Sequence, residues 1–130
     1  MNNKITGARI PYPKGEEPNL SIPETYNEYY RILLGRIGTN PLVTVCMNPS
    51  TANEKYSDKT ANRIINVSKK LGYDGWVIVN VYPERATKAI DLDAFNPDLS
   101  ELNVQSVKNF LLDNGFKEVW GAWGNQNIHP

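Results

Sequence analysis

The sequence predicts a single α/β domain, a three-layer sandwich built on a central and mainly parallel sheet. Three short apolar runs, at residues 42–47, 76–81 and 116–122, have the length and composition of buried strands. Each of the first two runs is followed by a longer segment with helical periodicity. The order strand, helix, strand, helix, strand implies parallel strands joined by crossover helices. A length of 130 residues suffices for one hydrophobic core.

Residues 1–24 predict an extended N-terminal arm in front of an α/β domain at residues 25–130. The arm has few aliphatic side chains and contains Pro11, Pro13, Pro18 and Pro23. Prolines at this density disfavour regular structure, so we expect no core element in the arm. The next segment, residues 26–37, allows two interpretations. Its apolar side chains fit a helical stripe, but Tyr30, Ile32 and Leu34 also alternate as in a strand.

The boundaries of the two helices follow from capping residues. Ser57 or Asp58 can accept hydrogen bonds from the first free amides of a helix that continues to about Leu71. Asn96 can do the same for a second helix, because the proline that follows it has no amide hydrogen to satisfy. The residues predicted to end the two helices in a left-handed conformation are Gly72 and Gly115.

Composition excludes several classes of protein. Lys and Arg together number 14, as do Asp and Glu, so the chain lacks the basic excess of a dedicated duplex-DNA binder. The single Cys46 cannot form an intramolecular disulfide or build a zinc site, and we expect it to be a buried thiol. No apolar run reaches the roughly 20 residues of a membrane span, and the start of the chain does not have the pattern of a signal peptide. We therefore expect a cytoplasmic protein without a membrane partner.

Three polar loops follow the three predicted strands and define the candidate site. If the strands are parallel, the loops meet at one edge of the sheet, where open α/β sheets bind ligands. The candidate ligand-binding residues are Asn48, Ser50, Thr51, Asn80, Tyr82, Arg85, Thr87, Trp123 and Asn125.

The residue types in these loops suit a planar, anionic ligand. Asn48 can read a base edge or orient a water molecule, Arg85 can bind a phosphate or carboxylate, and Tyr82 and Trp123 offer flat faces. The alternatives are ordinary strand-end turns and a surface ion pair of Arg85 with a neighbouring carboxylate. The glycines of the third loop lack the spacing and the lysine of a phosphate loop. The sequence contains no Ser-His-Asp set and no cluster of metal ligands, so we expect neither cofactor nor metal.

Several motifs resemble those of DUF1643, a family of unknown function. They cover about residues 28–125 and are Tyr30-Arg31, Met47-Asn48-Pro49-Ser50-Thr51-Ala52, Asp58-Lys59-Thr60 with Arg63, Val79-Asn80-Val81-Tyr82 with Arg85-Ala86-Thr87, Asn103, and Trp120-Gly121-Ala122-Trp123-Gly124. The resemblance implies a strand at residues 28–36, which we expect to pair antiparallel with the strand at 42–47 or to lie beside it.

A more distant similarity is to the uracil-DNA glycosylase superfamily, whose mismatch-specific branch has an Asn-Pro motif like Asn48-Pro49. The resemblance implies that Asn48 orients water or a base, that Asn80 and Tyr82 line a base pocket and that Arg85 meets a phosphate. The glycosylases also have a later segment with a His-Pro motif. His129-Pro130 lies too close to the last predicted strand to replace it.

Three hypotheses on function result. The first is binding, and even sequestration, of a nucleotide-like or nucleobase-containing small molecule at the carboxyl edge of the sheet. The second is an enzyme that hydrolyses an N-glycosidic bond in a nucleotide or in damaged or single-stranded DNA, with Asn48 as the catalytic residue that positions water. The third is a non-catalytic protein-interaction domain. Duplex DNA is not an expected partner, and the sequence leaves homo-oligomerisation open.

Overall fold

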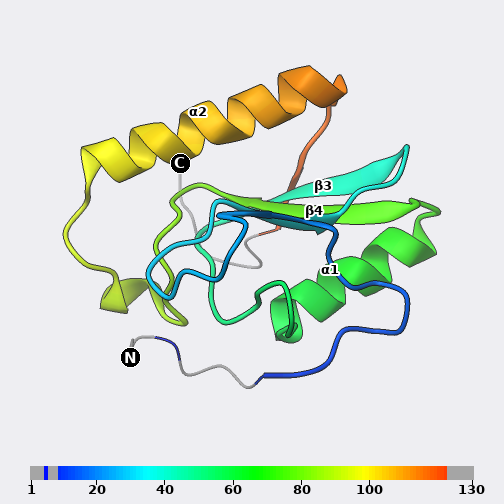
Figure 1. Ribbon diagram of the computed structural model, residues 1–130, viewed down its shortest axis with the longest axis horizontal. Coiled ribbons are helices and arrows are strands. Elements are labelled where there is room, and N and C mark those ends of the chain that lie inside the picture. Colours follow the sequence, from blue (N-terminus) through cyan, green and yellow to red (C-terminus); the bar gives the residue numbers. More distant parts are fainter. Residues whose placement is uncertain (1–4, 6–8, 123–130) are drawn as a thin grey trace.

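The computed structural model describes residue 5 and residues 9–122, which form a sheet with one helix on each face (Figure 1). In chain order, the elements are β1 Leu20–Ile22, β2 Leu33–Arg36, β3 Pro41–Cys46, α1 Lys59–Lys70, β4 Gly75–Asn80, the short 3-10 helix η1 Ala89–Asp91, α2 Pro97–Asn114 and β5 Trp120–Gly121. Trp123, Asn125 and His129 lie outside the described residues.

The sheet is mixed, with strand order β1-β2-β4-β3-β5. β3 runs parallel to both β4 and β5, which confirms that the three predicted strands are parallel, but they form one side of the sheet with β5 at its edge. β1 and β2 are antiparallel to each other, and β2 is antiparallel to β4. The expectation of a mainly parallel sheet was therefore wrong, because the segment before β3 adds an antiparallel half to it.

The strand expected at residues 28–36 is shorter than predicted and has a different neighbour. β2 begins at Leu33 and pairs with β4, not with β3. Residues 28–32 precede the strand and form no ladder with the sheet: Tyr30 makes an isolated antiparallel bridge with Glu84, and the Ile32 amide donates to the Ile22 carbonyl of β1. The Asn27 side chain accepts hydrogen bonds from the amides of Tyr29 and Tyr30, and this turn keeps the segment out of a ladder.

The helices begin and end where their capping residues predict. Asp58 caps α1 by accepting a hydrogen bond from the amide of Ala61 at 2.8 Å. Asn96 caps α2, and Gly115 ends it in the left-handed conformation with φ of 69°. β5 is shorter than the expected strand at 116–122, and the amide of Phe116 donates to the Leu111 carbonyl in the turn that follows α2.

Alternating side chains divide the core between the two faces of the sheet. On β4, Trp76 and Ile78 pack with α1, whereas Val77 and Val79 point to the face covered by α2. The α1 face includes Ile64 and Ile65 of that helix, both nearly inaccessible to solvent. β3 alternates in the same way, so that its even-numbered residues face α1.

The N-terminal segment contributes to this core, contrary to the sequence expectation. Tyr12 is buried in the α1-side cluster and stacks on Trp76 with ring centroids 5.8 Å apart. The Trp76 indole nitrogen donates to the Glu16 carbonyl. β1 then extends the sheet at its edge. The segment packs on the core although it is rich in proline and poor in aliphatic side chains, because the Tyr12 ring supplies the apolar surface.

Candidate functional site

The first two predicted loops meet at the carboxyl ends of β3 and β4. Beyond the last residues of these strands, the Val81 amide donates to the Cys46 carbonyl at 2.8 Å, and the Tyr82 amide donates to the Met47 carbonyl at 3.0 Å. The Ala86 amide then donates to the Pro49 carbonyl at 2.9 Å. The two loops are therefore joined along their length and form one rigid rim at this edge of the sheet.

Side-chain hydrogen bonds also connect the two loops. Asn48 Nδ2 donates to the Ala86 carbonyl at 2.7 Å, which fixes the orientation of the Asn48 amide. No group in the described part of the chain donates to its Oδ1, so this oxygen can accept from a ligand or from water. The hydroxyls of Ser50 and Thr87 lie 3.0 Å apart. Three of the predicted residues therefore lie together on the rim.

Arg85 lies inside the molecule. Its side chain is 2% exposed and donates to the backbone carbonyls of Asn27, Ser50 and Ala52. Its guanidinium also lies 5.0 Å from the centre of the Tyr26 ring. Burial, with a further contribution from the nearby charge of Arg31, lowers the pKa of Arg85 to about 10. These contacts give Arg85 a structural role, because they fasten both loops to the segment before β2.

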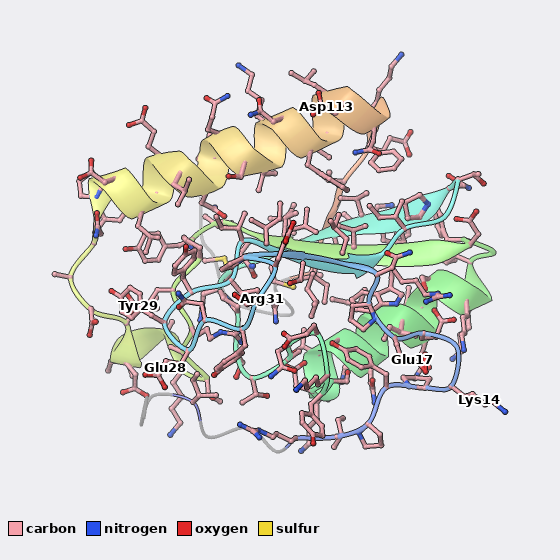
Figure 2. All side chains as sticks on the ribbon, in the orientation of Figure 1. Lys14, Glu17, Glu28, Tyr29, Arg31 and Asp113 are labelled. Carbon is pink, nitrogen blue, oxygen red and sulfur yellow. The ribbon has the colours of Figure 1, made fainter. Side chains whose placement is uncertain are left out.

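Arg31 is a second buried arginine (Figure 2). It donates to the same carbonyl as Arg85. Its Nη1 donates to the Ala52 carbonyl at 2.8 Å, and Arg85 reaches that carbonyl at 3.0 Å. The Ala52 amide in turn donates to Asp58 Oδ2. Burial lowers the pKa of Arg31, and the Asp58 charge opposes that shift. Residues 50–58 are thereby held in one conformation between the end of β3 and the start of α1.

Asn80 and Tyr82 do not share a cavity with Asn48. Asn80 is 4% exposed and its Nδ2 donates to the Arg31 carbonyl at 3.3 Å. Tyr82 turns towards the start of α2, where its hydroxyl accepts from the Asn96 amide and its ring stacks on Phe95 at 5.4 Å. Different parts of the protein therefore hold these two side chains: the segment before β2 holds Asn80, and the start of α2 holds Tyr82.

A cavity of about 560 Å³ opens between α1 and the strands β3 and β5. It is bordered by Thr44, Cys46 and Asn48 at and after β3, by Thr60, Arg63 and Val67 on α1, and by Trp120 and Ala122 at β5. Of the predicted site residues that the structure describes, Asn48 alone lies in this wall.

The cavity wall combines three kinds of recognition group. Arg63 is exposed on α1, and no carboxylate forms an ion pair with it among the residues described here. Trp120 is 45% exposed and presents an aromatic ring. Burial raises the pKa of the Cys46 thiol, so this wall residue is uncharged at neutral pH. The cavity can hold a molecule with an aromatic part and an anionic part.

Sequence reasoning did not select Thr60, Arg63 or Trp120 as ligand residues. A signal for the first two was present, because residues three apart in the first turn of a helix share one face, and this helix follows a site loop. Trp120 lies within the predicted third strand, where an aromatic residue is equally typical of the core.

The described part of the chain offers neither a metal-binding cluster nor a membrane-spanning helix. Residue 5 and residues 9–122 include no group of three or more His, Cys, Asp or Glu side chains that could hold a metal ion. Neither helix in that part of the chain is long and apolar enough to cross a membrane.

A comparison with family models assigns the chain to a protein family. The model of DUF1643, described as a protein of unknown function, matches residues 31–130. The chain therefore belongs to the DUF1643 family. No curated protein and no solved structure was found to match it, so the distant similarity to the uracil-DNA glycosylases is not confirmed.

Proposed function

We propose that the protein binds a nucleotide-like or nucleobase-containing small molecule in the cavity between α1 and β3. The observation that carries the proposal is the presence of three groups in the wall of one cavity: the Trp120 ring, the fixed Asn48 amide, and the Arg63 guanidinium, with which no carboxylate of the described residues pairs. A volume of about 560 Å³ lies in the range of small-molecule sites.

Each wall group has a defined task in this proposal. Trp120 stacks on the base, since every nucleobase offers a flat face. Arg63 binds the phosphate, and the start of α1 adds a favourable partial positive charge at the same end of the cavity. Asn48 Oδ1 accepts a hydrogen bond from the base edge. We assign anion binding to Arg63 rather than to Arg85, because the Arg85 guanidinium already donates hydrogen bonds to protein carbonyls.

Binding without turnover fits the wall better than hydrolysis. Among the described residues that border the cavity, none is an acid or a histidine, so the usual general acid and base are missing from them. We therefore favour sequestration of the ligand over cleavage of an N-glycosidic bond.

We further propose a distant relationship to the uracil-DNA glycosylases, based on the Asn-Pro motif after β3. We also propose that the protein is cytoplasmic.

Thermal unfolding with a panel of nucleotides, dinucleotides and ADP-ribose-type molecules tests the proposal. A ligand present at about 100 times its dissociation constant adds roughly 2.7 kcal/mol to the free energy of unfolding. We expect Arg63→Gln to weaken binding at least about tenfold, because hydrogen bonds to charged groups contribute about 1.5–3 kcal/mol. Lys70→Gln removes the same charge from an exposed position of α1 outside the cavity and should bind like the unchanged protein.

The fate of the ligand separates the remaining hypotheses. Heat release followed by chromatography should return the bound molecule intact. Release of a free base would instead support the hydrolase. If no member of the panel raises the unfolding temperature, or if Arg63→Gln and Lys70→Gln lose the same affinity, the proposed site is wrong.

A further inference from the structure

The opposite face of the sheet carries a second, chemically different groove beneath α2. This helix runs along that face (Figure 1), and only Asn103 and Phe110 of its residues are buried. A groove of about 560 Å³ remains between the helix and the sheet. Its floor includes Val45 and Val79, and its α2 wall includes Val107 and Leu111.

Two buried polar side chains, Asn80 and Asn103, border this apolar space. Asn103 is 2% exposed, and its Nδ2 donates to the carbonyls of Asn80 at 2.8 Å and Val81 at 3.3 Å. These two bonds fix the amide orientation, since the flipped amide would set oxygen against two carbonyl oxygens. Asn103 Oδ1, like Asn80 Oδ1, is then a buried acceptor without a donor among the residues that the structure describes. Such an atom is uncommon in a folded protein and calls for a hydrogen-bond partner.

We propose that this groove, here named the α2 groove, binds an elongated aliphatic molecule with an uncharged hydroxyl or amide head. The head donates to Asn103 Oδ1, and the aliphatic part lies on the valines and leucines. Lys108 also borders the groove, and no acidic residue does so among the described ones. The Lys108 charge disfavours a cationic head, and a carboxylate head has no hydrogen to donate to Asn103 Oδ1.

The dimensions of the groove set the length of the ligand. It extends along α2 from Asn103 to Leu112, and nine residues at a rise of about 1.5 Å span roughly 13 Å. At the rim, Val104 and Leu112 are 58% and 69% exposed, so they can close over an aliphatic chain. The ligand therefore has a chain of medium length and one donor at its end.

The experiment compares three probes of equal length by amide chemical shifts of the full chain. 1-Octanol has a donor head, heptyl methyl ether has an oxygen but no donor, and octylamine carries a positive charge. We expect 1-octanol to shift the amides of α2 that border the groove and to bind about five- to tenfold more tightly than the ether, as one added hydrogen bond predicts. Octylamine should bind more weakly than the alcohol.

A pair of variants localises the binding. Val107→Trp fills the α2 groove and should abolish the shifts, whereas Asp113→Trp adds the same ring on the outward side of α2 (Figure 2) and should leave them unchanged. Equal affinities for alcohol and ether would overturn the proposal even if Val107→Trp failed to fold. It is also overturned if 1-octanol shifts no α2 amide up to its solubility limit, or if Val107→Trp folds and binds 1-octanol normally.

Discussion

Replacing Arg85 by Met should destabilise the fold rather than simply remove a ligand contact. The guanidinium supplies hydrogen bonds to the carbonyls of Asn27, Ser50 and Ala52. Ala52 keeps its bond from Arg31, so two carbonyl oxygens lose their donor. An unsatisfied buried polar group costs about 1–3 kcal/mol. Because both carbonyls are only part-buried, we expect a loss of about 2–4 kcal/mol in the free energy of unfolding.

Urea unfolding followed by circular dichroism measures this loss. Lys88→Met removes a positive charge from an exposed position three residues along the chain and should unfold at the same urea concentration as the unchanged protein. Arg85→Lys should fall between the two, since one ammonium group cannot reproduce the planar fork of a guanidinium. Surface substitutions usually change the free energy of unfolding by no more than about 0.5 kcal/mol. A change of that size for Arg85→Met would refute the structural role of Arg85.

Three further predictions concern Tyr12, Cys46 and Tyr29. Tyr12→Ala should cost about 3–5 kcal/mol in thermal unfolding because it removes a buried ring that stacks on Trp76, and a loss below about 1 kcal/mol would contradict the place of the N-terminal segment in the core. Alkylation of Cys46 by iodoacetamide at pH 8 should be at least about tenfold slower in the native protein than in urea, because burial raises the pKa of its thiol and restricts access; equal rates would disprove this. Burial and the hydrogen bond to Glu84 raise the pKa of Tyr29 to about 12. The native state then holds this proton above pH 10 while the unfolded chain loses it, so the stabilisation is complete below pH 10 and is lost as the pH approaches 12. Tyr29→Phe should accordingly show a shallower decrease of the urea midpoint over that range, and parallel curves would argue against the shifted pKa.

The elements that could be predicted from the sequence are those with local signals. Asp58 and Asn96 cap the two helices through bonds that span two or three residues, and Gly115 ends α2 with a positive φ that glycine adopts easily. The apolar runs of β3 and β4 are similarly visible, because both faces of these strands are covered.

The errors concern interactions between residues far apart in the chain. The partner of β2 depends on which strand edge is free in the folded sheet, and no pattern within residues 33–36 encodes that choice. Tyr12 enters the core because Trp76, 64 positions later, offers a ring at the right distance. Both outcomes depend on the assembled fold rather than on local preference.

The proposed cavity reaches the carboxyl edge of the sheet, where the sequence predicted a site, but of the described predicted residues it includes Asn48 alone. A polar run such as residues 80–87 has the same sequence character whether its side chains bind a ligand or fasten two loops together. In the structure, Arg85 fastens the loops and Asn48 reaches a cavity wall. Arg63 was harder to select, because an exposed arginine on a helix is ordinarily a solvated surface residue.

A crystal structure of the protein soaked with a mixture of nucleotides would show whether the cavity binds such a ligand. We expect electron density for one nucleotide-like molecule between α1 and β3, with its base against Trp120, a phosphate near Arg63 and a hydrogen bond to Asn48 Oδ1. A soaked crystal in which this cavity is accessible but empty, or in which the nucleotide binds elsewhere on the molecule, would contradict it.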